Sequence, residues 1–326
     1  MESTNVLEFP DVSKDYISDL KYIPEINTVI VTSWDGSLSM YKIIPSNGSY
    51  NITLDKQYNV GFSILSCCYS QDGIYIGGVQ GELTFLNFQT ETFQLIDDNK
   101  ATSGIIRITP YYHDFIAGSW DSTLQVIDHI DHSIKSFKAI EDAKILSMDC
   151  TNEHLVVSTT GNKIKLYKLP LNSMNNGTLI DSVLKYQTRD IKLIPDGSGY
   201  VIGSIDGRVA VEYFDDPSRQ FAFRCHRKKL SDVQFVYPVN SLLFKPSSDI
   251  LFTGGADGCV SCWSLKGRRK LKQYNKIDEK SVVKMAGGDG ILFVAASDDS
   301  FKTNAIITQD IELQPSSVYL IVLDTN

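Results

Sequence analysis

A hairpin pattern that occurs seven times limits the folds open to this chain more than any other feature. Its first copy, Val31–Tyr41, has the pattern of a strand, a two-residue turn at Asp35-Gly36 and a second strand. Glycine tolerates the positive φ that a tight hairpin requires, and apolar residues alternate on both sides of the turn. The equivalent turn positions are Asp35, Gln80, Asp121, Gly161, Asp206, Asp257 and Asp298.

The spacing of these turns, 40 to 51 residues, indicates the architecture. A period of that length is typical of four-stranded β-propeller blades. A short apolar run precedes each hairpin, and we expect it to be the innermost strand of its blade. The seven runs are Asp15–Leu20, Phe62–Cys67, Gly104–Ile108, Lys144–Met148, Arg189–Leu193, Val239–Phe244 and Ser281–Met285. Shorter runs at Thr92–Ile96 and Phe221–Cys225 are expected to be outer strands.

The last repeat is one strand short. It is interrupted after Asp299 and resumes as Ser317–Leu323. We expect Asn5–Phe9 to supply the missing outer strand, because closure of the ring removes exposed strand edges. The sequence therefore predicts an all-β fold, a single seven-bladed propeller domain over residues 1–326. The longest interval between turns is attributed to extended loops at Asp215–Arg219 and Arg224–Tyr237.

Composition narrows the functional class. The chain is 42% hydrophobic, has no run of 18 apolar residues and lacks a basic, apolar leader, so we expect a soluble protein without a membrane partner. A net charge of -8 disfavours direct nucleic-acid binding, which needs a broad basic surface. Six cysteines lie mostly in expected strands, which favours reduced thiols in a cytosolic or nuclear protein.

Two clusters have the residue types of metal sites. Cys259 and Cys262 are three apart on an expected strand, so their side chains would point to opposite faces. Asp128–His132 contains two imidazoles and two carboxylates, but it follows a strand and is expected to be a solvated turn. Phosphate-loop, HExxH and GxSxG elements are absent from the sequence. We therefore expect no metal, no cofactor and no enzymatic activity.

Two tryptophans share one position of the repeat. Trp34 and Trp120 stand just before the turn aspartate in the first and third copies. The other copies carry Val79, Thr160, Ile205, Ala256 and Ser297 there. Such a residue lies on the rim of one face, so it either packs on the rim or anchors a partner. Trp263, on a strand, is expected to be core.

Arginine stands out in the fifth copy. Arg208 follows the turn glycine, where other copies carry Ser37, Glu82, Thr123, Lys163 and Cys259. The outer strand of that blade ends near Arg224 and Arg227, and one of these two should return to the same face. Converging guanidinium groups suit a phosphate or carboxylate. The alternative is ion pairing with Asp206, Glu212 or Asp232, and the pattern alone does not choose between them.

Five runs resemble the Bub-three family of mitotic checkpoint proteins, which are WD-repeat propellers. They are Thr32–Leu38, Leu184–Arg189, Ser204–Tyr213, Phe221–Arg227 and Tyr237–Ser241, and the resemblance as a whole spans nearly the whole chain. The Rae-type messenger-RNA export factors share only part of them. The chain departs from the WD consensus by losing the Trp-Asp dipeptide in most blades, as at Met40-Tyr41. The buried hydrogen-bond tetrads usual in such propellers are therefore in doubt.

The resemblance implies a non-enzymatic adaptor of the spindle assembly checkpoint in the nucleus and at the kinetochore. Its implied partners are GLEBS segments of the Bub kinase and its Mad/BubR relative, phosphorylated MELT repeats of a kinetochore scaffold, and the anaphase-promoting complex activator. By this resemblance Trp34, Trp120 and Arg189 would bind GLEBS, and Arg208 and Arg224 would bind phosphothreonine. The alternatives are a Rae-type export adaptor that binds a nucleoporin GLEBS segment, and an enzyme that uses a propeller pocket.

Overall fold

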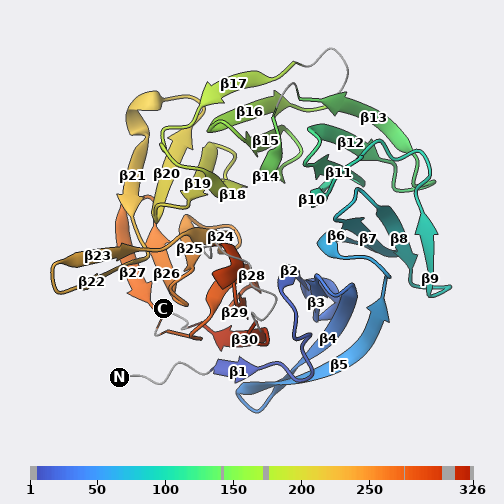
Figure 1. The fold of residues 1–326 in the computed structure, drawn as a ribbon, viewed down its shortest axis with the longest axis horizontal. Helices are drawn as coiled ribbons and strands as arrows, with labels where there is room; N and C mark the ends of the chain where they lie inside the picture. Colours follow the sequence, from blue (N-terminus) through green and yellow to red (C-terminus); the bar gives the residue numbers. More distant parts are fainter. Residues whose placement is uncertain (1–5, 141–142, 172–175, 275, 303–312, 324–326) are drawn as a thin grey trace. The chain divides into compact units, whose positions relative to one another are not determined.

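The computed structural model describes residues 6–140, 143–171, 176–274, 276–302 and 313–323. Two compact units make up the chain, residues 62–223 and a terminal unit of residues 1–61 and 224–326. Seven four-stranded sheets and one two-stranded sheet account for the strands of the described residues. These seven sheets are the blades of a seven-bladed β-propeller, as the repeats predict (Figure 1). None of the described helices is long and apolar enough to span a bilayer.

The unit of residues 62–223 contains blades 2 to 5, except for Arg224, the last residue of blade 5. Blade 2 consists of β6 (Ile64–Ser70), β7 (Gly73–Gly78), β8 (Leu83–Asn87) and β9 (Thr92–Leu95), and blade 3 of β10 (Ile105–Tyr111), β11 (Asp114–Ser119), β12 (Thr123–Ile127) and β13 (Ile134–Ala139). Blade 4 consists of β14 (Ile145–Cys150), β15 (His154–Thr159), β16 (Lys163–Lys168) and β17 (Thr178–Asp181), and blade 5 of β18 (Thr188–Leu193), β19 (Gly199–Ser204), β20 (Arg208–Tyr213) and β21 (Phe221–Arg224). A 3₁₀ turn, η2 (Pro217–Arg219), precedes β21.

The terminal unit contains blades 1, 6 and 7. Blade 1 consists of β2 (Ile17–Ile23), β3 (Thr28–Ser33), β4 (Ser37–Ser46) and β5 (Ser49–Asn59), with η1 (Pro24–Ile26) between the first two. Blade 6 consists of β24 (Val239–Phe244), β25 (Ile250–Gly255), β26 (Val260–Ser264) and β27 (Arg269–Gln273). Blade 7 consists of β28 (Ser281–Gly288), β29 (Ile291–Ser297), β30 (Ser317–Val322) and β1 (Val6–Glu8), and η3 (Ser300–Lys302) follows β29. The seven predicted inner strands and both predicted outer strands are confirmed to within a few residues.

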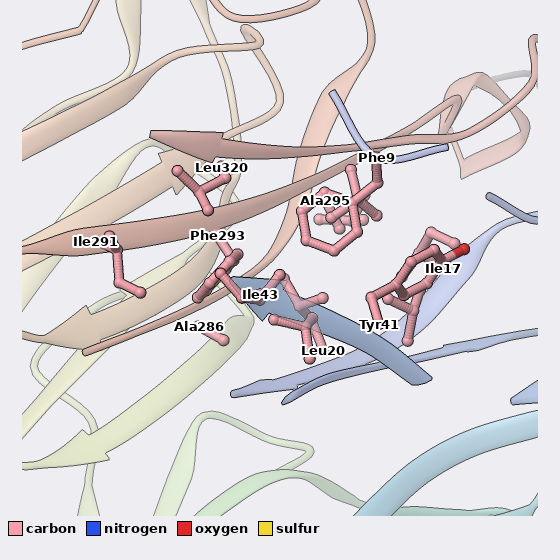
Figure 2. Packing of buried hydrophobic residues seen from close by; sticks show 14 residues of the cluster. Phe9, Ile17, Leu20, Tyr41, Ile43, Ala286, Ile291, Phe293, Ala295 and Leu320 are labelled. Atoms are coloured by element: carbon pink, nitrogen blue, oxygen red, sulfur yellow. The ribbon is translucent and has the colours of Figure 1, made fainter. Parts of the chain in front are cut away.

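The N-terminal strand completes blade 7, as predicted. β1 pairs antiparallel with β30, with Val6 opposite Ile321, and the Phe9 amide donates to the Val318 carbonyl at 2.8 Å. The Phe9 ring is buried and lies 5.0 Å from the Tyr41 ring of blade 1 and 6.0 Å from the Phe293 ring of blade 7. Figure 2 shows these rings in one cluster. Burying one such ring contributes about 1.5–3 kcal/mol. Asn5, the first residue of the predicted strand, lies outside the described residues.

Every inner strand carries a β-bulge near its start. In β18 the register with β19 shifts between Thr188 and Asp190, and the same irregularity occurs in β2, β6, β10, β14, β24 and β28. A bulge turns the side chain of its extra residue away from the regular alternation of the strand. The residues at this position are Ser18, Leu65, Ile106, Leu146, Arg189, Asn240 and Val283.

The segment 224–237, predicted to be a loop, is largely a β-hairpin. β22 (Arg227–Leu230) pairs with β23 (Val233–Val236) as a separate two-stranded sheet. The loop prediction was wrong because the turn between the strands contains no glycine. Ser231 adopts the positive φ of 52° that a tight turn requires.

Candidate functional site

In blades 1 to 6 a recurring backbone hydrogen bond joins the B–C turn to the start of the inner strand of the same blade. The amides of Trp34, Trp120 and Ile205 donate to the carbonyls of Tyr16, Gly104 and Gln187, at 3.1, 2.9 and 3.1 Å. The start of strand A, the B–C turn and the end of strand D lie at the same end of an antiparallel blade. Each of the five predicted site residues is therefore at this end of its own blade.

Trp34 belongs to an aromatic cluster in the terminal unit. Its ring centroid lies 4.5 Å from that of Tyr16 and 5.4 Å from that of Phe301. The Lys302 ammonium donates to the Tyr16 hydroxyl at 2.6 Å and lies 4.5 Å from the centre of that ring. Trp34 is half-buried, so it packs on the rim and also offers part of its ring to a partner.

Trp120 lies against the backbone of its own blade. A Cβ built on Gly104 would lie 2.6 Å from Trp120 Cε3, so only glycine leaves room for this ring. The turn beside it is fixed by Asp121, which accepts hydrogen bonds from the Thr102 hydroxyl at 2.8 Å and the Thr123 amide at 3.0 Å. Trp120 is also half-buried. Both tryptophans thus combine rim packing with partial exposure.

Arg189 occupies the bulge of β18, and it is the only charged residue at this position among the seven inner strands. The strand is anchored immediately after it. Asp190 Oδ1 accepts from Arg107 Nη2 at 2.8 Å and from the Ser147 hydroxyl at 2.8 Å, and all three residues are buried. Removing one partner of a buried ion pair typically costs about 3–5 kcal/mol, so this link between blades 3, 4 and 5 holds the bulge firmly.

Arg208 begins β20 directly after the turn of blade 5. Its Nε lies 2.9 Å from Asp206 Oδ2, and 41% of its side chain is exposed. Of the three carboxylates offered as alternative partners, Asp206 therefore pairs with it. Glu212 instead accepts from the Tyr200 hydroxyl at 3.0 Å inside the blade, where burial raises the pKa of its carboxyl. A half-exposed ion pair contributes about 0–1 kcal/mol, so an anion of higher charge can compete with Asp206.

Arg224 ends β21 and is followed by a buried histidine that the sequence analysis did not assign. His226 Nδ1 lies 2.9 Å from Asp257 Oδ1, and its Nε2 lies 2.9 Å from Thr253 Oγ1, which accepts from Trp263 Nε1 at 3.1 Å. One assignment of donors satisfies all three hydrogen bonds: the indole donates to the threonine, the threonine to the histidine, and the histidine to the aspartate. Blade 6 therefore retains the tetrad that the sequence had placed in doubt.

This tetrad corrects the expectation for Trp263 and holds the segment that carries Arg224 and Arg227. Trp263 was expected in the core, but it is half-buried, and its indole nitrogen donates to Thr253 in the tetrad. His226 lies between Arg224 and Arg227 in the chain, so its ring fixes the segment that carries both. The sequence signal for the tetrad was a histidine ahead of an inner strand, followed in the same repeat by a turn aspartate and a tryptophan on strand C.

The acidic cluster that resembles a metal site pairs with a lysine. Asp128 and His129, in the turn between β12 and β13, lie close to Asp114 at the start of β11. Lys135 Nζ contacts Asp114 Oδ2 at 2.8 Å and Asp128 Oδ2 at 2.7 Å. The Lys135 ammonium helps to lower the pKa of Asp128 to about 2. A cation would have to displace this ammonium. All six cysteines are free thiols.

A groove of about 790 Å³ lies between blades 4 and 5 and contains none of the predicted site residues. Its lining includes His154, Tyr200, Glu212 and Phe214, and the His154 ring stacks on Phe214 at 4.8 Å. The side chains of β15 and β20 meet here across the blade boundary. Tyr200 and Glu212 belong to the same buried packing.

Comparison with known proteins identifies the family. Residues 219–264 match the model of the WD domain, G-beta repeat. The chain is 31% identical to "Spindle assembly checkpoint protein bub3" of Schizosaccharomyces pombe, over 83% of this chain and 85% of that protein. The chain belongs to the Bub-three family. Another member, "Mitotic checkpoint protein BUB3.1" of Arabidopsis thaliana, is 28% identical over 90% of this chain and 87% of its own length.

This Bub-three protein is also similar to one export protein in sequence and to one solved structure in fold. A "Poly(A)+ RNA export protein" of Schizosaccharomyces pombe is 29% identical over 83% of this chain and 78% of its own length. The solved "Structure of U3-55K" superimposes with a TM-score of 0.75, covers 98% of both chains and is 14% identical. At that identity the likeness supports the fold alone.

Proposed function

We propose that this chain is a non-enzymatic adaptor of the spindle assembly checkpoint that acts in the nucleus and at kinetochores. Its membership of the Bub-three family, in which relatives carry checkpoint names, supports the proposal. The partners are GLEBS segments of the Bub kinase and the Mad/BubR-type protein, and phosphorylated MELT repeats of the kinetochore scaffold. We also include the anaphase-promoting complex activator among them.

GLEBS binding would use Trp34, Trp120 and Arg189. The two half-buried rings offer flat apolar area at the turn ends of their blades, where a truncated hot-spot aromatic costs about 2 kcal/mol or more. Arg189 offers the one guanidinium among seven equivalent bulge positions. A peptide with both acidic and apolar residues suits these side chains.

Phosphothreonine would be bound by Arg208 and Arg224, and the observation that carries this proposal is the exposed guanidinium of Arg208. At the start of β20 it pairs with the carboxylate of Asp206, which is 18% exposed, in a chain of net charge -8. A phosphate carries about -1.5 to -2 charges and three acceptor oxygens, whereas a hydroxyl offers little to a guanidinium. Binding should therefore depend on phosphorylation.

Calorimetric titration of phosphorylated and unmodified MELT peptide tests this site. A charge-assisted hydrogen bond contributes about 1.5–3 kcal/mol, so Arg208→Ala and Arg224→Ala should each weaken the phosphopeptide roughly tenfold to a hundredfold. Arg219→Ala is the matched control, because Arg219 is similarly exposed but covers the Tyr213 ring at 4.0 Å. Equal affinity for both peptides, or a loss confined to Arg227→Ala, would show that the site is wrong.

The tryptophans need a variant that preserves packing. Since Trp34 contacts Tyr16 and Phe301, Trp34→Ala removes internal contacts together with the binding surface. Trp34→Phe and Trp120→Phe retain a ring, and each should weaken a GLEBS peptide while the thermal midpoint moves little. Unchanged titrations with both variants would assign these residues to rim packing alone.

The second candidate is a messenger-RNA export adaptor that binds a nucleoporin GLEBS segment. The 29% identity to the poly(A)+ RNA export protein favours it. Affinity purification from mitotic extract distinguishes the two, since checkpoint kinases should co-purify with an adaptor of the checkpoint and nucleoporins with one of export.

A further inference from the structure

The hairpin β22–β23 is a separate arm with a fixed base. At the base, the Tyr237 amide donates to the His226 carbonyl at 3.0 Å, and the His226 ring is held by the buried tetrad of blade 6. Beyond the base, β22 and β23 pair only with each other among the described residues, so each strand has one free edge (Figure 1). A two-stranded hairpin of this kind is marginal alone and accepts a third strand readily.

The register divides the arm into two faces. Directly opposed residues share a face and successive residues alternate, so the pairs Leu230–Val233 and Lys228–Phe235 lie on one face. The exposed fractions of Leu230, Val233 and Phe235 are 50%, 57% and 44%. Three adjacent apolar side chains this exposed form a patch that no described part of the chain covers.

The other face of the arm is basic. It carries the pairs Arg227–Val236 and Lys229–Gln234. With Lys228 the arm has three cationic residues and one anionic residue, Asp232, although the whole chain has a net charge of -8. The charge of the arm is therefore opposite to that of the chain, which favours an acidic partner.

We propose that the arm binds an extended, acidic partner segment as a third strand along the free edge of β22. Backbone groups of that edge would supply the ladder, and side chains of the added strand would alternate between the two faces. Apolar residues would then lie beside Leu230, and acidic residues beside Arg227 and Lys229. The partner segment is one in which acidic and apolar residues alternate, and it needs no phosphate. This surface is distinct from the residues assigned above to GLEBS and phosphothreonine.

The test uses the full chain and a labelled, capped octapeptide of four Glu-Val repeats. Fluorescence anisotropy should show binding of this peptide, weaker binding of a peptide with four Glu followed by four Val, and least binding of four Lys-Val repeats. Leu230→Ser and Phe235→Ser should each weaken the first peptide at least fivefold. Leu271→Ser on β27 is the matched control, since Leu271 is 44% exposed and lies on another strand.

A charge reversal distinguishes strand addition at the arm from nonspecific electrostatic attraction to the rest of the protein. Lys229→Glu should move the preference toward the Lys-Val peptide, whereas Lys266→Glu, which changes an exposed lysine outside the arm, should not. Substitutions at these exposed positions should leave the thermal midpoint of the protein unchanged. Val233→Thr removes an apolar side chain from the patch but keeps a residue with high strand propensity. The proposal is overturned if arm variants bind as the wild type does, or if alternating and block peptides bind equally. It is also overturned if the same variants abolish self-association in sedimentation or binding to anionic vesicles instead.

Discussion

The B–C turns of blades 5 and 6 share one sequence pattern but use it differently. Both contain Asp-Gly with a positive φ at the glycine, 65° at Gly207 and 74° at Gly258. In blade 6 the aspartate, Asp257, receives a hydrogen bond from buried His226. In blade 5 the aspartate, Asp206, pairs with the half-exposed Arg208. The residue that meets the carboxylate therefore decides whether the turn stabilises the blade or presents a charge to a ligand.

The two turns should also differ in how much they contribute to the free energy of unfolding. Leaving a buried hydrogen-bonding group without its partner costs about 1–3 kcal/mol, whereas a surface ion pair contributes about 0–1 kcal/mol. We therefore expect stability to depend on the turn of blade 6 and binding on the turn of blade 5.

The largest effect should come from His226→Ala. It leaves Thr253 and Asp257 without their buried partner, so the free energy of unfolding should fall by about 3 kcal/mol in urea denaturation. In blade 5, Asp206→Ala removes the partner of Arg208 and the acceptor of the Ser204 hydroxyl, and it should cost less, about 1 kcal/mol. Similar losses in the two variants would contradict the comparison.

Arg208→Lys should change binding without changing stability. A lysine keeps the positive charge but cannot make a bidentate contact, so affinity for phosphorylated MELT peptide should lie between those of the wild type and Arg208→Ala. Titration calorimetry measures the affinity, and the urea midpoint should stay constant. Full recovery by lysine would indicate that charge alone is recognised.

Glu212→Gln should alter the pH dependence of blade 5. Burial raises the pKa of Glu212 above its ordinary value of 4.5, so the folded state holds this proton more tightly than the unfolded state. The wild type therefore loses stability as the pH rises from 4.5 through the folded pKa, and the glutamine variant does not. Urea denaturation should show a larger advantage of the variant at neutral pH than at acidic pH. Parallel curves would show that Glu212 does not titrate differently in the folded state.

The smallest effect should come from Asp206→Asn. The amide preserves the shape of the turn and removes the charge beside Arg208, so stability should change by less than about 1 kcal/mol. Affinity for the phosphopeptide should rise slightly, because the phosphate no longer competes with a carboxylate. A fall in affinity would mean that Asp206 positions the guanidinium for binding.

The repeat predicted the blades because hydrophobic alternation and turn residues are local signals. Val239–Phe244 agrees with β24 to the residue, and the N-terminal strand was inferred from the shortage of one strand in the last repeat. The hairpin β22–β23 escaped prediction because Ser231-Asp232 is a weak turn signal beside Asp-Gly. The tetrad was missed because Trp263 was assigned to the core, so its hydrogen-bonded link through Thr253 to His226 and Asp257 was not expected.

The residues of the candidate site are proposed from the sequence, whereas their surroundings were known only from the structure. Trp34, Trp120 and Arg208 stand out in the sequence alone, because they differ from the residues at the same positions of the other repeats. The bulge that holds Arg189, and the ion pair of Asp190 with Arg107 beside it, depend on the spatial neighbours of β18.

The pairing of β1 with β30 sets an order of events during protein synthesis. At roughly 5–20 residues per second, β1 leaves the ribosome tens of seconds before its partner strand exists. Until blade 7 has been synthesised, β1 has no partner strand and Phe9 has no Phe293 to pack against. Nascent chains of this protein therefore pass through a long interval in which β1 has no partner strand and Phe9 is not buried against blade 7, and they should depend on chaperones during that interval.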